Sequence, residues 1–235
     1  MKTSLLCSLV LATALQLAHG QEALNQLTDV EKSAGWTLLF DGKDASPHWR
    51  GYKKEKLPEG WVAEDGALVR KGPGDIITKE KYESFDLSLD WKITEGGNSG
   101  LMFKVLETEG PPYATGPEVQ IQDNVKGKDP QKAGWMYQLY AASVDTTKPV
   151  GEWNRMLVKC HKTKAGTYKC EHWMNGTKYV EYEIGSEEWN QKVAKSKFAQ
   201  MNGFGKAASG HICLQDHGNE VAFRNLKIRV INGTE

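Results

Sequence analysis

Alternating apolar and polar residues recur along most of this chain, and they predict antiparallel β-strands. The clearest run is 85–94, where every second residue from Phe85 to Ile93 is apolar. Because side chains along a strand point to opposite faces in turn, this run predicts a long strand with one buried face. Similar runs predict strands over 35–41, 61–63, 67–71, 75–78, 101–106, 117–123, 134–141, 152–162, 167–174, 177–183, 210–218 and 220–230.

Turn and helix signals separate these runs, and we expect the runs to form one antiparallel domain. Asn175-Gly176 is a strong two-residue hairpin turn, and Asp65-Gly66 favours another. Ser186 is a candidate N-cap for a helix over 187–197, and the lead-in 21–34 has room for one more short helical turn. The chain shows no linker or internal repeat. We therefore expect an all-β, single-domain sandwich or jelly roll over 35–231 with one short helix.

Charge and composition narrow the class of partner. Lys plus Arg and Asp plus Glu are both 30, so the formal net charge is zero. A nucleic-acid binder usually carries a basic stripe, and a balanced chain argues against one. No stretch after the first 20 residues is apolar for long enough to span a membrane.

Residues 1–20 read as a secretory signal. A basic Lys2 precedes an apolar run over 5–17, and Ala18-His19-Gly20 is a small-x-small cleavage site. We therefore expect an exported protein, periplasmic or secreted, that is cleaved near Gly20. Export would permit a disulfide between Cys160 and Cys170, which flank a hairpin, but the sequence leaves that pairing open.

Two strands carry an unusual polar face. In 117–123, Glu118, Gln120 and Gln122 share one face while Val119 and Ile121 share the other. In 210–218, the residues His211, Cys213, Gln215 and His217 lie opposite Ile212 and Leu214, and Asp216 falls at the turn. If the two strands are neighbours, a carboxylate, amides and imidazoles converge.

Those groups suit sugar chemistry. Amides and carboxylates pair with hydroxyl groups, and a histidine can move protons near neutral pH. A Glu/His/Asp cluster can also hold a divalent cation. Each residue has a plainer alternative: Glu118 as a solvated carboxylate, His211 and His172 as buried structural histidines, and Arg224 as a surface arginine.

Several known catalytic signatures are missing from the sequence. It has no nucleophile elbow, no phosphate-binding glycine loop and no His-Glu-x-x-His motif, so we expect no nucleotide cofactor. A classical retaining or inverting glycosidase needs two carboxyls that flank the scissile bond. Glu118 with Asp123 or Asp216 would supply them, but the sequence does not give their separation.

Eight motifs, in order over nearly the whole chain after residue 34, resemble the 3-keto-disaccharide hydrolase family. They are Gly35–Asp44, Gly97–Gly100, Glu118–Ile121, Gly151–Asn154, Glu171–Gly176, Ser196–Phe198, Gly210–Gly218 and Phe223–Ile228. Relatives often have Tyr where this chain has Val119. The resemblance implies a concanavalin A-like jelly roll in an exported bacterial protein. It also implies cleavage of glycosides oxidised at the sugar 3-position, because a 3-ketone acidifies the C2 proton and allows C1 to lose its substituent.

Strand faces and motif positions together assign trial roles. We expect His217 or His211 as the base, with Asp216 in the catalytic group. Glu118, Asp216 and His172 are the trial ligands of a divalent metal of unknown identity. Substrate-orienting residues are expected to be Glu118, Gln120, Gln215, Asn98, Lys197 and Arg224. The competing hypotheses are a non-catalytic carbohydrate-binding module and a structural domain whose polar faces do not converge.

Overall fold

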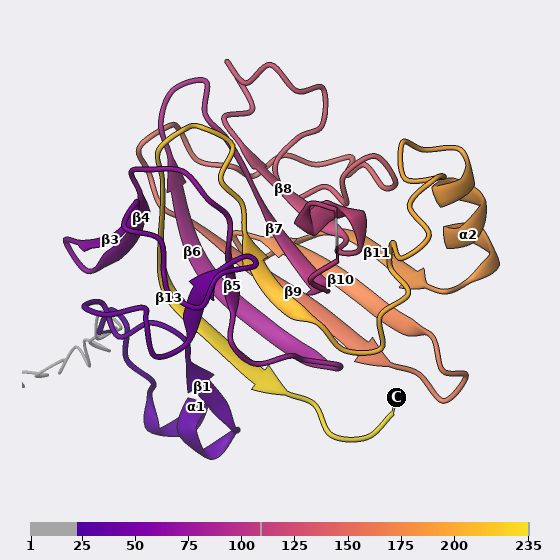
Figure 1. The fold of residues 1–235 in the computed structure, drawn as a ribbon, viewed down its shortest axis with the longest axis horizontal. Helices are drawn as coiled ribbons and strands as arrows, with labels where there is room; N and C mark the ends of the chain where they lie inside the picture. Colours follow the sequence, from indigo (N-terminus) through magenta and orange to yellow (C-terminus); the bar gives the residue numbers. More distant parts are fainter. Residues whose placement is uncertain (1–22, 109, 235) are drawn as a thin grey trace, which may run out of the picture.

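The computed structural model describes residues 23–108 and 110–234, so the expected signal over 1–20 lies outside the described residues. Two antiparallel sheets face each other (Figure 1). The larger has the strand order β11 (Thr177–Ile184), β10 (Tyr168–Met174), β9 (Asn154–Lys162), β6 (Phe85–Ile93), β13 (Val221–Val230), β4 (Ala67–Arg70) and β3 (Trp61–Glu64), with β1 (Trp36–Leu38) also on β13. The smaller has the order β2 (Trp49–Gly51), β5 (Ile76–Thr78), β12 (His211–Leu214), β7 (Asn98–Val105) and β8 (Glu118–Gln122). The expected β-sandwich is confirmed.

The apolar faces of the two sheets form the core between them. Leu87 and Leu89 of β6 are fully buried, and so are Ile121 of β8 and Ile212 and Leu214 of β12. Polar residues at alternate positions of β8 and β12 must therefore point away from the core, towards the outer face of the smaller sheet. That arrangement confirms the two strand faces expected from the sequence.

Two α-helices and one 3₁₀ turn flank the sheets. α1 (Asp29–Ser33) begins at Thr28, whose side chain forms a capping box with Glu31. α2 (Glu187–Ala194) begins at Ser186, whose Oγ accepts the Trp189 N–H at 3.1 Å, as the sequence predicts. The 3₁₀ turn η1 (Pro112–Ala114) lies beside β7. None of the helices in the described residues is long and apolar enough to cross a membrane.

The strand expected over 134–141 is wrong. This segment is a series of turns with isolated bridges from Met136 to Val119 and Tyr140. Gly134 and Gln138 have φ values of +86° and +68°, which a continuous strand cannot hold. The segment instead folds along the free edge of β8, where the Tyr137 N–H donates to the Glu118 carbonyl at 2.9 Å.

Cys160 and Cys170 lie directly opposite each other on β9 and β10, as the hairpin suggested. Both thiols are free and fully buried, so the disulfide left open by the sequence is not present in this structure. Cys213 is also free, and it packs with Met102, Ile77 and Val105 on the outer side of the smaller sheet.

Candidate active site

A pocket of about 300 Å³ opens on the outer face of the smaller sheet. Its walls come from four strands or strand ends and from the loops that fold over them. The lining residues are Asp75, Asn98, Met102, Tyr113, Glu118, Gln120, Asp129, Tyr137, Lys197, Gln215, Asp216 and His217. The structure therefore brings together seven of the residues singled out from the sequence: Asn98, Glu118, Gln120, Lys197, Gln215, Asp216 and His217.

β7 separates the two polar strands, which are not direct neighbours. Gly100 of β7 pairs with Gln120 of β8, and its carbonyl accepts the Gln215 N–H at 2.9 Å. A Cβ added at Gly100 would overlap the Glu118 carboxyl, so the missing side chain makes room for that group. The two polar faces can converge because a glycine stands between them.

Glu118 is the most unusual group in the pocket. Only 4% of it is exposed, and among the described residues no donor hydrogen-bonds its carboxyl. Burial raises the pKa of Glu118 to about 8; Lys197 opposes that shift, while Asp129 and Asp75 add to it. The carboxyl is therefore mostly protonated at pH 7, which suits a proton donor.

Asp216 is held by its surroundings. Its carboxylate accepts the N–H groups of Gly74 at 2.7 Å and Gly218 at 2.9 Å, and it pairs with Arg70 at 2.7 Å. Burial acts to raise the pKa of Asp216, but these three partners together lower it. The Asp216 N–H in turn donates to Asp75 Oδ1 at 2.8 Å. These contacts of Asp216 hold the turn that carries His217. For the neighbouring Asp75, burial is the main cause of a raised pKa.

Amides and a histidine complete the inner wall. Gln120 Nε2, Gln215 Oε1 and Asn98 Oδ1 are buried and have no hydrogen-bond partner in the described part of the chain. Buried polar atoms are rarely left without a partner, so these three are available to ligand hydroxyl groups. His217 lies beyond them and is exposed to solvent. The pocket can therefore present donors, acceptors and proton-transfer groups to one sugar ring.

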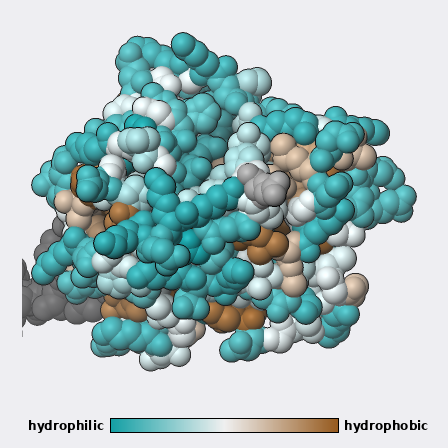
Figure 2. Space-filling view, viewed as in Figure 1, coloured by the Kyte–Doolittle hydropathy of each residue, from teal (hydrophilic) through white to brown (hydrophobic). Residues whose placement is uncertain are grey.

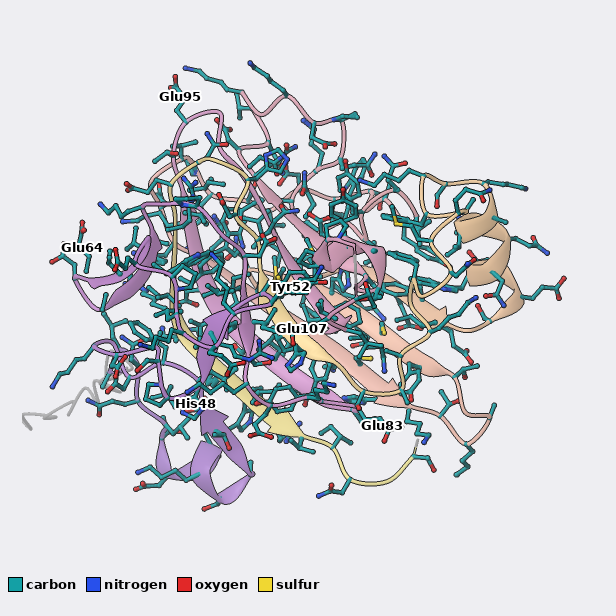
Figure 3. All side chains as sticks on the ribbon, viewed as in Figure 1. His48, Tyr52, Glu64, Glu83, Glu95 and Glu107 are labelled. Atoms are coloured by element: carbon teal, nitrogen blue, oxygen red, sulfur yellow. The ribbon has the colours of Figure 1, made fainter. Side chains whose placement is uncertain are left out.

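Three expected site residues lie elsewhere. His211 is buried at the other end of β12, where its ring donates to the Thr78 carbonyl at 2.7 Å, and burial lowers its pKa. The carboxyl of Glu107, which is labelled in Figure 3, interacts electrostatically with His211 at that end of the sheet.

His172 and Arg224 project from the larger sheet. The ring of His172 is fully buried between the Gly134 carbonyl at 3.0 Å and the Tyr182 hydroxyl at 2.8 Å, and burial lowers its pKa to about 4. Arg224 lies 4.1 Å from the Trp153 ring centroid and pairs with Asp90 at 3.4 Å. Neither residue lines the pocket.

The trial metal ligands do not meet. Glu118 and Asp216 line the pocket, but His172 does not. Both nitrogens of His172 are engaged, and the Asp216 carboxylate is already held by Arg70 and two backbone groups. Within residues 23–108 and 110–234, no group of three or more His, Cys, Asp or Glu side chains is placed to hold a metal ion. The described residues therefore do not fit a metal site of the expected composition.

Sequence reasoning missed five pocket residues: Asp75, Met102, Tyr113, Asp129 and Tyr137. Asp75 is the first residue of the strand predicted over 75–78, which pairs with β12, so its position at a strand end was a usable signal. Asp129 and Tyr137 belong to irregular segments along the edge of β8, and the strand predicted over 134–141 did not indicate that Tyr137 would meet Asp129. Their proximity is visible only in the fold, where the Tyr137 hydroxyl donates to Asp129 Oδ2 at 2.8 Å.

The surface around these elements is mainly hydrophilic. Figure 2 shows this face covered by polar residues, with small, separate apolar patches. The pocket itself is lined mainly by polar side chains, which can hydrogen-bond a hydrophilic ligand.

Comparisons with known proteins identify the family of this chain and support its fold. The profile of the 3-keto-alpha-glucoside-1,2-lyase-like domain matches residues 35–229. A 3-keto-disaccharide hydrolase of Bacteroides thetaiotaomicron is 31% identical, and the match covers 84% of this chain and 79% of that protein.

Solved structures show the same architecture. A candidate glycosyl hydrolase from Parabacteroides distasonis, solved at 1.70 Å, superposes with a TM-score of 0.81 at 36% identity, covering 89% of this chain and all of that one. A second from the same organism, at 2.00 Å, gives a TM-score of 0.59 at 28% identity over 78% of this chain and 99% of its own.

Proposed function

This chain belongs to the 3-keto-alpha-glucoside-1,2-lyase-like domain family, and on that premise we propose that it cleaves glycosides whose sugar ring carries a ketone at C3. Its kinship with a 3-keto-disaccharide hydrolase and with candidate glycosyl hydrolases makes it a carbohydrate-active enzyme. The ketone substrate and the reaction course are proposals, and the observation that supports them most directly is the buried carboxyl of Glu118 in a pocket with three unpartnered polar atoms.

The proposed reaction begins with removal of the C2 proton. A ketone at C3 acidifies that proton, because the electron pair of the broken C–H bond passes to the ketone oxygen as an enolate. We assign the base role to His217, whose imidazole lines the pocket mouth and is suited to proton transfer near neutral pH. His211 is too deeply buried, and too far along β12, to share this role.

The second step breaks the bond from C1 to the leaving oxygen. The enolate electrons form a C1–C2 double bond, and the departing oxygen takes a proton from Glu118. A carboxyl whose pKa is about 8 holds that proton at pH 7, which makes it a competent general acid. Water then adds across the double bond, with oxygen to C1 and a proton to C2, to give the free keto-sugar. If water does not add, the product is the unsaturated sugar.

Gln120, Gln215 and Asn98 are assigned to substrate binding. Their unpartnered buried atoms supply one donor and two acceptors, which matches the mixed character of vicinal hydroxyl groups. Asp216 is assigned to positioning, because Arg70 and two backbone N–H groups already hold its carboxylate.

Incubation of the purified protein with a 3-keto-disaccharide and with the same disaccharide unoxidised tests the proposal. We expect release of the second sugar from the oxidised compound alone, and deuterium at C2 of the recovered keto-sugar when the solvent is D₂O. Glu118→Gln and His217→Ala should each abolish release. Equal cleavage of both compounds would contradict the C2 route, and binding without cleavage would favour a carbohydrate-binding module.

Export is a separate proposal that rests on residues 1–20. Expression of the full chain in a Gram-negative host, followed by cell fractionation and N-terminal sequencing, tests it. We expect the chain outside the cytoplasm with Gln21 as its first residue, and recovery of an uncleaved cytoplasmic chain would contradict export.

A further inference from the structure

The ammonium group of Lys197 lies over aromatic rings at the edge of the pocket. Its Nζ is 4.2 Å from the ring centroid of Tyr137, 5.3 Å from that of Tyr113 and 5.2 Å from that of Phe198. A cation within about 6 Å of an aromatic centroid is attracted to the negative ring face. We propose that Tyr113 and Tyr137 position Lys197 to bind the ketone oxygen of the substrate and to stabilise the charge that develops there. This inference rests on the proposed function.

The main chain on both sides of Lys197 is anchored. Phe198 is fully buried, and its ring stacks on that of Phe204 with centroids 3.9 Å apart. Ser196 Oγ donates to the Val193 carbonyl at 2.8 Å and accepts the Phe198 N–H at 3.1 Å. The backbone position of Lys197 is therefore set by α2 and the aromatic core, while the direction of its exposed side chain depends on the tyrosine rings.

Tyr137 is tied to the strand that carries Glu118. Its N–H donates to the Glu118 carbonyl at 2.9 Å, and its hydroxyl donates to Asp129 at 2.8 Å. Burial, helped by Asp129, raises the pKa of Tyr137 to about 12, so the hydroxyl keeps its proton and remains a donor. Because the backbone of Tyr137 is bonded to β8, its ring can hold a flexible lysine over the pocket.

The charges in the pocket explain why this lysine matters. The acidic lining residues are Asp75, Glu118, Asp129 and Asp216, and the basic ones are Lys197 and His217. If His217 takes the C2 proton, Lys197 is the remaining lining cation that can face the enolate oxygen. A fixed donor aimed at developing charge contributes about 10²–10³ in kcat in other enzymes.

Kinetics of three variants on a 3-keto-disaccharide test the positioning. Lys197→Met should lower kcat about 10²-fold with little change in KM, as expected for a contact made in the transition state. Tyr137→Leu should lower kcat in the same way, because the ammonium is no longer held. Tyr137→Phe keeps the ring and loses only the hydroxyl, so it should retain most of the activity. The double variant Tyr137→Leu/Lys197→Met should be no worse than Lys197→Met alone.

A titration of Glu118 by carbon-13 NMR supplies a readout that does not need turnover. The charged groups that face Glu118 are Lys197, Asp129 and Asp75, with Asp216 and His217 across the pocket. Lys197 lowers the pKa of Glu118, so Lys197→Met should raise it further. Tyr137→Leu should raise it too, and Tyr137→Phe should leave it close to the wild-type value.

Two results would overturn the proposal that Tyr137 positions Lys197. One is a pKa of Glu118 that does not change in Tyr137→Leu, and the other is a loss of kcat in the double variant equal to the product of the two single losses. If the wild-type protein cleaves no 3-keto-glycoside, the proposed reaction and the ketone contact both fall. The NMR titration would then still decide whether Tyr137 holds Lys197 near Glu118.

Discussion

Gly100 on β7 lies directly against the carboxyl of Glu118 on β8, and a Cβ at Gly100 would overlap that carboxyl. The glycine allows an acidic side chain to lie flat on the sheet, away from solvent and from any donor in the described residues. The high pKa of Glu118 thus depends on a glycine in β7, the strand that lies between β8 and the β12 strand leading to His217.

Gly100→Ala should displace the Glu118 carboxyl towards solvent. We expect the pKa of Glu118 to fall, because burial is the main cause of its rise, and kcat to fall because the proton donor is misplaced. Overpacking should lower the free energy of unfolding by about 1–3 kcal/mol. The pH profile of kcat and urea unfolding at pH 7 measure the two effects separately. An unchanged alkaline limb in the pH profile would contradict this role for Gly100.

Glu118 should make the protein less stable as the pH rises. Its pKa is about 8 in the folded chain, against 4.5 for an ordinary glutamate, so between these pH values the folded state holds the proton more tightly than the unfolded state. The stabilisation that this group gives to the folded state is therefore complete below about pH 4.5, and it is lost as the pH rises towards 8.

Glu118→Gln removes that titration and serves as the reference. We expect the variant to gain stability relative to the wild-type protein between pH 5 and pH 8, as measured by urea unfolding at both values. Because the two proteins share every other titrating group, the difference between their free energies of unfolding reports the contribution of Glu118 alone. A difference that does not vary with pH would show that Glu118 titrates normally.

The sequence predicted the sheets and seven of the twelve pocket residues, because the sheets and the polar strand faces depend on local periodicity. Alternation in β8 and β12 placed Glu118, Gln120 and Gln215 on the outer face, and the structure has them there. The hairpin turn at Asn175-Gly176 and the N-cap at Ser186 were also predicted correctly, since each depends on a few adjacent residues.

Other features could not be predicted because they depend on packing between distant segments. His211 shares a strand face with Gln215, yet it lies beyond the pocket, where the Thr78 carbonyl binds its ring. Tyr137 reads as part of a strand by composition, but turns with positive φ fold it over Glu118. Alternation gives the face of a residue; it gives neither the position along the sheet nor the path of an irregular loop.

Arg70 and Asp216 should behave as a coupled pair that holds the turn before His217. Their side chains are 12% and 16% exposed and 2.7 Å apart, so removing one partner leaves a poorly solvated charge. Arg70→Met should lower the free energy of unfolding by about 3 kcal/mol. The double variant Arg70→Met/Asp216→Asn should lose less than the sum of the single variants. Additive losses in thermal or urea unfolding would mean that the two groups act independently.

His211 and His217 should respond to substitution in opposite ways, although they lie on the same strand and turn. His211 is 3% exposed and donates to a backbone carbonyl, so His211→Ala leaves that acceptor unpaired and should lower the free energy of unfolding by about 1–3 kcal/mol. Cleavage of a 3-keto-disaccharide by the folded variant should remain within a few fold of the wild-type rate.

His217→Ala removes an exposed side chain from the pocket, so the free energy of unfolding should change little while cleavage is lost. Unfolding curves and initial rates on the same preparations measure both, and a His211→Ala protein that is stable but inactive would transfer the base role from His217 to His211.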